Sequence, residues 1–153
     1  MPITISSAGK STFANILCCV QNPTGGDILV NGKAVTTDKH VVNKLIGECK
    51  QDDLLWPNLT AREHLELFAG IRGESKTDLP QTVQTWLESV DLDSVQHQRV
   101  RTFSGGMRRR LSVAMATIGG APVVVLDEVS VHDIQTSVNH SNLCSRGLTT
   151  PYS

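Results

Sequence analysis

The apolar residues at the start of the chain are spaced first like a strand and then like a helix. Ile3 and Ile5 alternate with polar neighbours, which predicts a short strand. Residues 13–20 then carry apolar side chains three or four positions apart, so we expect a helix that is stopped by the breakers in residues 23–26. The helical positions are Phe13, Ile16, Leu17 and Val20.

Four further segments have the short apolar runs of strands. Residues 28–30 and 33–35 flank an Asn-Gly pair at residues 31–32, which favours the tight turn of a β-hairpin. Residues 45–49 form another short run, and residues 123–126 form the continuous apolar run typical of a buried parallel strand. Strands that alternate with helices predict an α/β fold.

The chain between residues 54 and 103 predicts a helical subdomain inserted between these strands. Thr60 and Glu63 form a capping box, in which the Thr hydroxyl and the Glu carboxylate bond to free amides at a helix start. A second amphipathic helix follows, with apolar residues at the spacing i, i+3, i+4, i+7. The apolar positions are Leu65 and Phe68 in the first helix and Val83, Trp86, Leu87 and Val90 in the second.

A third helix is expected to begin at Ser104 and to end at the breakers in residues 119–122. Its apolar residues also follow helical spacing, and it leads into the strand at 123–126. After residue 128 the pattern is lost, and residues 129–153 are rich in Ser, Thr, Asn and His. We therefore expect a partial domain over residues 1–128 and a divergent, irregular tail over residues 129–153.

Composition narrows the classes of function. The chain has 153 residues and a net charge of −1, so it has no general attraction to nucleic acid, and we read Arg108–Arg110 as a solvated helix face. Its mean hydropathy of −0.10 fits a soluble domain, and no apolar run approaches the ~20 residues that span a bilayer. The four cysteines lack Cys-x-x-Cys spacing and are read as buried reduced thiols, while His132, His140 and Cys144 match no zinc pattern.

Gly9, Lys10 and Ser11 match the end of the phosphate-binding pattern G-x-x-x-x-G-K-[ST]. In such a loop the backbone amides surround the phosphates, the lysine reaches the terminal phosphates, and the hydroxyl binds magnesium. The first glycine of the pattern would fall at Thr4, and a β-branched residue there resists the close approach that glycine allows. The loop is therefore half intact, and alone it is weak evidence for a phosphate site.

Three further groups of candidate site residues lie at the ends of predicted strands or at the start of a predicted helix. Asp127 and Glu128 end the strand at 123–126, where Asp127 would hold magnesium and Glu128 would orient a water; the alternative is a solvated acidic turn. Gln51 follows the strand at 45–49, and its amide could bind magnesium and the attacking water. Ser104, Gly105 and Gly106 begin a helix, and amides at a helix start suit phosphate oxygens.

These motifs are jointly specific because of their order along the chain. That order is Gly-Lys-Ser-Thr, then Gln51, the helical insertion, Ser-Gly-Gly and Leu-Asp-Glu. They resemble the nucleotide-binding domain of ATP-binding cassette (ABC) transporters over about residues 7–130. The separation of Ser104 and Asp127, 127 − 104 = 23 residues, is similar to the spacing in that family. Residues 103–112 resemble the signature motif of subfamily A, whose full-length members mostly move lipids, and residues 59–65 resemble the segment after the family's Q-loop.

The resemblance implies a P-loop NTPase-type ABC ATPase core with an inserted α-helical subdomain, and ATP and Mg²⁺ as cofactors. It implies that Ser104, Gly105 and Gly106 contact the γ-phosphate of ATP held by a second nucleotide-binding domain in a head-to-tail dimer. It also implies a place at the cytoplasmic face of a membrane, against the transmembrane domains of a transporter. The remaining implied roles are nucleotide binding by Ala8, Gly9, Lys10, Ser11, Thr12 and Gln51, magnesium binding by Ser11, Gln51 and Asp127, and base catalysis by Glu128.

The chain departs from the family pattern at both ends. The family has an adenine-stacking aromatic in a strand-rich segment before the phosphate loop, and a switch histidine about thirty residues after the glutamate; neither His132 nor His140 fits that place. We therefore expect an incomplete core whose exposed sheet edges make it poorly soluble in isolation. An ATP-hydrolysing transporter cassette and a remnant with weak or no nucleotide binding both stay open, with a soluble cassette ATPase as a third alternative.

Overall fold

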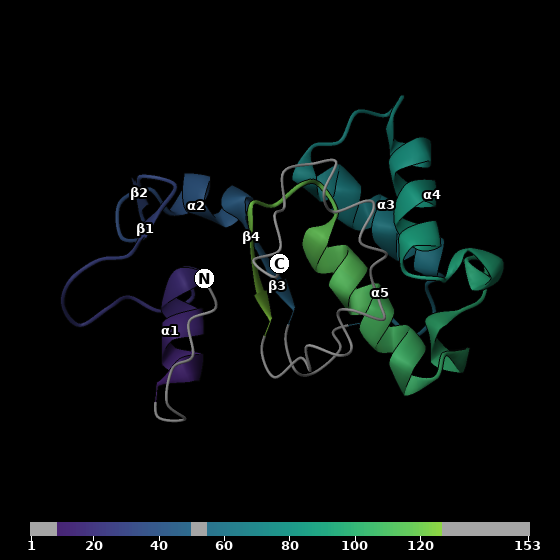
Figure 1. Ribbon diagram of the computed structural model, residues 1–153, viewed down its shortest axis with the longest axis horizontal. Coiled ribbons are helices and arrows are strands. Elements are labelled where there is room, and N and C mark those ends of the chain that lie inside the picture. The colour runs from purple at the N-terminus through teal and green to yellow at the C-terminus, as the bar shows by residue number, and fades with distance from the viewer. Residues whose placement is uncertain (1–8, 50–54, 127–153) are drawn as a thin grey trace, which may run out of the picture.

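The computed structural model describes residues 9–49 and 55–126. Figure 1 shows the helices and strands of these residues. The helices are α1 (Lys10–Leu17), α2 (Lys39–Leu45), α3 (Ala61–Arg72), α4 (Leu79–Ser89) and α5 (Gly105–Thr117), with short 3₁₀ turns η1 (Asp93–Val95) and η2 (Val100–Thr102). The strands are β1 (Leu29–Val30), β2 (Lys33–Ala34), β3 (Ile46–Cys49) and β4 (Val123–Leu126).

The described strands pair in two places. β1 and β2 form an antiparallel hairpin, and Asn31 and Gly32 at its tip have the positive φ values, 50° and 75°, of a tight hairpin turn. β3 and β4 pair in parallel, in a register that places Cys49 beside Leu126. The helices α3, α4 and α5 lie in the crossover between these two parallel strands, so the predicted α/β fold is confirmed.

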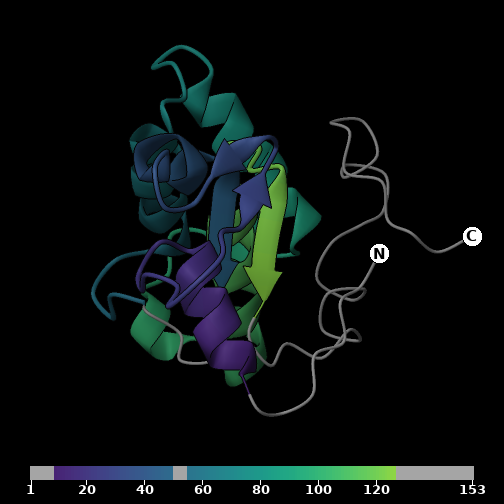
Figure 2. The same ribbon diagram turned by 90° about the vertical axis from the view of Figure 1, so that its left-hand side faces the viewer.

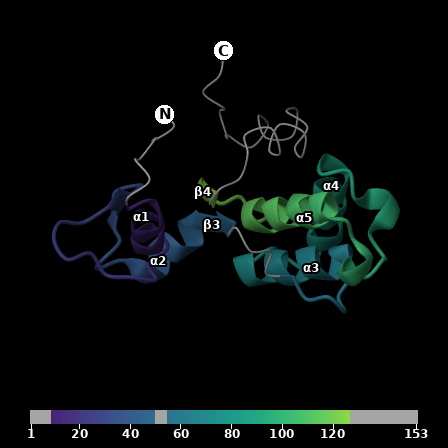
Figure 3. The ribbon, with the colours of Figure 1, turned by 90° about the horizontal axis from the view of Figure 1, so that it is seen from below.

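The helices cover the parallel strands from two sides. β3 and β4 lie between α1 and α5, while α3 runs alongside α5 and packs against α4 (Figures 1 and 3). The larger apolar cluster joins α3, α4 and α5, and its fully buried residues include Leu65, Leu87, Leu92, Leu111 and Ile118. A smaller cluster of Val30, Val35, Val42 and Ile46 lies under α1, α2 and the hairpin. Burial of each large side chain contributes ~2 kcal/mol, so the helical cluster is the main source of stability.

The strand β3 and the helix α5 meet at the level of their backbones. A Cβ atom placed on Gly47 would lie 1.8 Å from the carbonyl oxygen of Ala116. Cys49, Val113 and Ala116 form a small buried cluster beside this contact. Only glycine fits at residue 47, and this close approach holds α5 against the sheet.

Arg72 makes a second connection between the helical cluster and β3. Its guanidinium donates to the carbonyl oxygens of Ile46 (2.8 Å) and Lys44 (3.3 Å), at the junction of α2 and β3. Burial lowers the pKa of Arg72. Its side-chain stem lies against Gly119, where an added Cβ would fall 2.5 Å from the Cβ of Arg72. Arg72 therefore ties the end of α3 to the α2–β3 junction and to the segment that leads into β4.

In residues 13–45, one expectation is wrong and one helix was not predicted. The first helix does not continue to Val20, because it ends at Leu17 and the amides of Val20 and Gln21 bond back to the Asn15 carbonyl. Val20 is 66% exposed. The sequence also gave no signal for α2, of which Val42 is the one buried residue, because a single apolar contact makes no helical period.

The structure tests some of the expectations for the cysteine, histidine and arginine side chains. Cys49 is buried as expected, whereas Cys18 and Cys19 are only half-buried. Cys144, His132 and His140 lie outside the described residues. Arg108–Arg110 are half-buried and not a solvated face, and Arg110 forms an ion pair of 3.1 Å with Asp91. Within residues 9–49 and 55–126, no helix has both the length and the apolar character needed to cross a bilayer.

Candidate nucleotide-binding site

The helix α1 begins directly after a glycine in a left-handed conformation. Gly9 has φ 103° and ψ −4°, and its carbonyl accepts the first helical bond, from the amide of Phe13 (2.9 Å). The amides of Lys10, Ser11 and Thr12 therefore have no acceptor within the helix. Ser11 and Thr12 are exposed. Exposed amides and hydroxyls at the positive end of a helix form a site that suits phosphate oxygens.

The parallel strands end beside this helix start. Figures 1 and 2 show the first turn of α1 at the same end of the molecule as the ends of β3 and β4. In α/β sheets, ligands bind outside the carboxyl ends of the strands. β3 ends at Cys49, two residues before Gln51, and β4 ends at Leu126, directly before Asp127 and Glu128. Gln51, Asp127, Glu128 and Ala8 lie outside the described residues.

The second predicted phosphate contact is the start of α5. Ser104 is its N-cap, and the Ser104 hydroxyl accepts from the amide of Met107 (3.2 Å). Ser104, Gly105 and Gly106 are exposed. A Cβ placed on Gly105 or Gly106 would meet no described atom within 4 Å, so packing among the described residues does not explain these glycines. Glycine there leaves the amides of the first turn open to a group from outside.

The two helix starts are not brought together. α1 lies on one side of β3 and β4, and the start of α5 lies on the other side, toward α4 (Figures 1 and 3). A single nucleotide phosphate cannot touch both. The structure therefore does not join the two predicted phosphate contacts into one site within the described residues.

His64, which the sequence analysis did not single out, is hydrogen-bonded to the segment that precedes α3. His64 is fully buried, and its Nδ1 donates to the Thr60 carbonyl (2.7 Å) while its Nε2 accepts from the amide of Trp56 (3.0 Å). The Trp56 ring lies beside the imidazole, with centroids 5.6 Å apart. Burial is the main cause that lowers the pKa of His64, against the opposite effects of the Thr60 hydrogen bond and the Glu63 charge. His64 is therefore neutral near pH 7.

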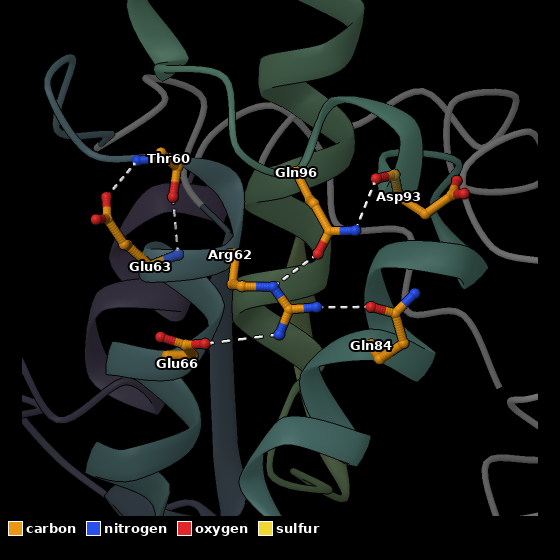
Figure 4. A network of polar contacts seen from close by, with 7 residues as sticks. All are labelled: Thr60, Arg62, Glu63, Glu66, Gln84, Asp93 and Gln96. Carbon is orange, nitrogen blue, oxygen red and sulfur yellow. Dashed lines mark hydrogen bonds and ion pairs between the residues drawn. The ribbon is translucent and has the colours of Figure 1, made fainter.

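The predicted capping box is confirmed, and a guanidinium network lies beside it (Figure 4). The Glu63 carboxylate accepts from the Thr60 amide (2.8 Å), and the Glu63 amide donates to the Thr60 hydroxyl (3.2 Å). The capping hydrogen bonds from Thr60 lower the pKa of Glu63. Arg62 donates to the side-chain oxygens of Gln96 and Gln84, each at 2.6 Å. Arg62 thus joins α3 to α4 and to the segment after η1, a role that the spacing of apolar residues could not indicate.

Comparison with known proteins identifies the family of the chain. The family described as "ABC transporter" matches residues 5–131. Over 123 residues the chain is 43% identical to ABC transporter A family member 8 of Dictyostelium discoideum, and the match covers 80% of this chain and 15% of that protein. Over 127 residues it is 43% identical to the glucosylceramide transporter ABCA12 of Mus musculus, with coverage of 82% and 5%.

The fold also matches a solved structure. A dimeric ATP-binding cassette bound to ADP and Pi, in a post-hydrolysis state, superimposes with a TM-score of 0.67 at 24% sequence identity. The match covers 86% of this chain and 59% of that chain. The chain thus has the fold of an ABC ATPase domain, in part, while it spans only a small fraction of the A-family relatives. On the family match over residues 5–131, the chain belongs to the ABC transporter family.

Proposed function

We propose that this chain binds and hydrolyses ATP as part of a subfamily A transporter, and that it drives transport through membrane-spanning domains. The observation that most supports this is the convergence of the α1 start with the ends of β3 and β4, from which the sequence continues to Gln51 and Asp127. The name of the ABCA12 relative supports a lipid as the cargo. The site would then face the cytoplasm, at the membrane surface.

In the proposed site, the amides of Gly9–Thr12 and of Ala8 hold the phosphates, and the Lys10 ammonium balances their charge. Magnesium, when bound, neutralises charge that develops on the phosphate oxygens. Ser11, Gln51 and Asp127 offer the oxygen ligands that magnesium prefers. Glu128 accepts a hydrogen bond from water and orients it in line with the γ-phosphate. Each role uses a residue type whose chemistry fits it.

A second nucleotide-binding domain completes the site in this proposal. The exposed start of α5 supports it, because Ser104, Gly105 and Gly106 present a helix N-terminus with no described atom over the glycines. The partner's ATP would place its γ-phosphate there. The dimeric state of the matched cassette structure supports the same arrangement.

The first test is magnesium-ATP binding by the full chain, measured by titration calorimetry. We expect a Kd between micromolar and millimolar, and at least a tenfold weaker Kd for Lys10→Ala, since a charge-assisted contact to phosphate contributes about 1.5–3 kcal/mol. Lys33→Ala is the matched control, because Lys33 is exposed on the hairpin and removal of its charge should leave the Kd unchanged. Absence of binding by a folded chain, or equal binding by Lys10→Ala, contradicts the proposal.

Hydrolysis and dimerisation separate the remaining roles. We expect Glu128→Gln to keep ATP binding, to lose phosphate release, and to form an ATP-dependent dimer in analytical ultracentrifugation. Gly106→Ala in that background should prevent the dimer while ATP still binds to the same chain. Gly70→Ala is the control, because Gly70 is a helical glycine of α3 with open space around it and lies away from both helix starts. If the parent chain binds ATP without turnover under all conditions, it is a nucleotide-binding remnant and not an ATPase.

A further inference from the structure

The segment from Leu55 to Thr60 is hydrogen-bonded to the turn that precedes α5. The amide of Val100 donates to the Leu59 carbonyl (2.9 Å), and the amide of Arg101 donates to the Pro57 carbonyl (3.0 Å). Thr60 and Arg99 form an isolated antiparallel bridge beside these bonds. We call residues 55–60 the strap. The strap therefore holds the backbone of η2 at residues three and four positions before the Ser104 cap.

His64 is the side chain that fixes the strap to α3. Its two ring nitrogens bond to two strap residues, to the Trp56 amide at 3.0 Å and to the Thr60 carbonyl at 2.7 Å. These bonds require one tautomer, with the proton on Nδ1 and a lone pair on Nε2. An imidazolium would point an N–H at the N–H of Trp56, and that hydrogen bond would be lost.

The surroundings of His64 contain few groups that could replace this contact. Among the described residues, its electrostatic partners are the Thr60 carbonyl and the Glu63 carboxylate, and Arg99 acts on Glu63 in turn. The strap itself has no ionisable side chain. The Trp56 ring lies beside the imidazole and 6.3 Å from the ring of Phe68 between centroids, and His64 is 0% exposed. Among residues 9–49 and 55–126, no side chain other than that of Glu63 acts on His64 electrostatically, so protonation would leave the new N–H on Nε2 facing the amide of Trp56.

We propose that His64 is a positioning residue, which in its neutral Nδ1–H form holds the strap against η2 and so fixes the start of α5. Protonation of His64 releases Trp56, loosens the strap and exposes the amides of Val100 and Arg101. The consequence for phosphate contact by Ser104, Gly105 and Gly106 rests on the proposed function. The positioning itself does not, since it concerns the chain without nucleotide.

Amide hydrogen exchange, followed by NMR on the ¹⁵N-labelled full chain, tests this without nucleotide. Protection factors, which correct for the intrinsic pH dependence of exchange, are compared at about pH 7.5 and about pH 5. We expect protection at Trp56, Val100 and Arg101 to fall by at least about tenfold at the lower pH, with that of Leu87 in α4 unchanged. The titration of Glu63 lies below this range, because its pKa is lowered from 4.5.

Two substitutions separate the two ring nitrogens. Gln at residue 64 keeps an acceptor near the place of Nε2 and cannot titrate, so His64→Gln should keep high protection at both pH values. Asn keeps only a donor near the place of Nδ1, so His64→Asn should have low protection at both. His97→Gln is the matched control, because His97 is exposed in the same part of the chain and should behave like the parent.

Three results of the exchange experiment would overturn the proposed role of His64. Equal protection at both pH values in the parent overturns it, and so does an equal fall at Leu87, which would mean a general loss of stability. Persistence of the pH dependence in His64→Gln overturns it as well. If a variant fails to fold, the parent's imidazole ¹⁵N shifts still decide, because a proton on Nε2 near pH 7 contradicts the required tautomer. A chain that passes this test but binds no ATP would refute the proposed function alone.

Discussion

Replacement of Gly47 by alanine tests the backbone contact that joins the sheet to the helical cluster. The added Cβ would lie 1.8 Å from the Ala116 carbonyl oxygen and 2.8 Å from the Ala116 carbonyl carbon. An ordinary carbon–oxygen contact is about 3.3 Å, so β3 and α5 would have to separate by about 1.5 Å. A gap of 0.5–1 Å already removes roughly a quarter to a half of the dispersion energy along a packed face.

The helix cannot make that movement alone. Leu111, Ala114 and Ile118 on α5 are fully buried in the helical cluster, and a shift of α5 would disturb their contacts as well. Overpacking of a core typically costs about 1–3 kcal/mol, and a clash with backbone lies at the upper end. We therefore expect Gly47→Ala to lower the free energy of unfolding by about 3 kcal/mol or more.

Urea unfolding followed by far-UV circular dichroism and tryptophan fluorescence measures this effect. Gly70→Ala is the opposite control, because Gly70 lies inside α3 with open space at its Cβ position and should stabilise by about 0.5–1 kcal/mol. With m of about 1.5 kcal/mol/M, the two midpoints should differ by about 2 M or more. Ala116→Gly should not rescue Gly47→Ala, because the obstacle is a backbone oxygen. A Gly47→Ala chain as stable as the parent would refute the contact.

Three further predictions concern the helical cluster and its caps. Leu65→Ala should cost about 2–5 kcal/mol of unfolding free energy in the same urea assay, because Leu65 is fully buried, whereas Leu67→Ala at a 42% exposed position should cost far less. Ser104→Ala should cost about 1 kcal/mol through loss of the Met107 amide bond, and Ser104→Gly only a few tenths; equal costs would argue against the cap. The pKa of Glu63 is lowered in the folded chain, so its contribution to stability is present above about pH 4.5 and is lost as the pH falls through the folded pKa. In Glu63→Gln the urea midpoint should therefore fall less steeply as the pH drops below about 4.5. An equally steep fall would contradict this role of Glu63.

The elements that could be predicted from the sequence are those whose signal is local. The capping box at Thr60, the Asn-Gly hairpin and the apolar period of α4 each lie within a few residues, and each is present in the structure. The pairing of β3 with β4 depends on the whole crossover, but the uninterrupted apolar run at residues 123–126 already indicated a parallel strand.

The missed features all depend on partners far away in the sequence. Arg72 bonds to Ile46, 26 residues earlier, and Gly47 is required by the Ala116 carbonyl, so neither follows from local spacing. α2 has a single buried residue and therefore no amphipathic period. For the candidate site, the sequence identified the phosphate-loop residues Gly9–Ser11 and the helix start at Ser104, but only the fold shows that a helix begins at Lys10 and that the two helix starts lie on opposite sides of the parallel strands.

Two pairs of glycines lie at the two ends of α5, and glycine is found at each end for a different physical reason. Gly119 and Gly120, after the helix, have positive φ values of 83° and 71°, and a Cβ on Gly119 would overlap the Arg72 side chain. Gly105 and Gly106, before it, meet no described atom within 4 Å, and no positive φ is required of them. Glycine in the first turn of a helix costs stability relative to alanine, and packing among the described residues does not offset that cost. We infer that contact with an external anion offsets it, as the proposed dimer would supply.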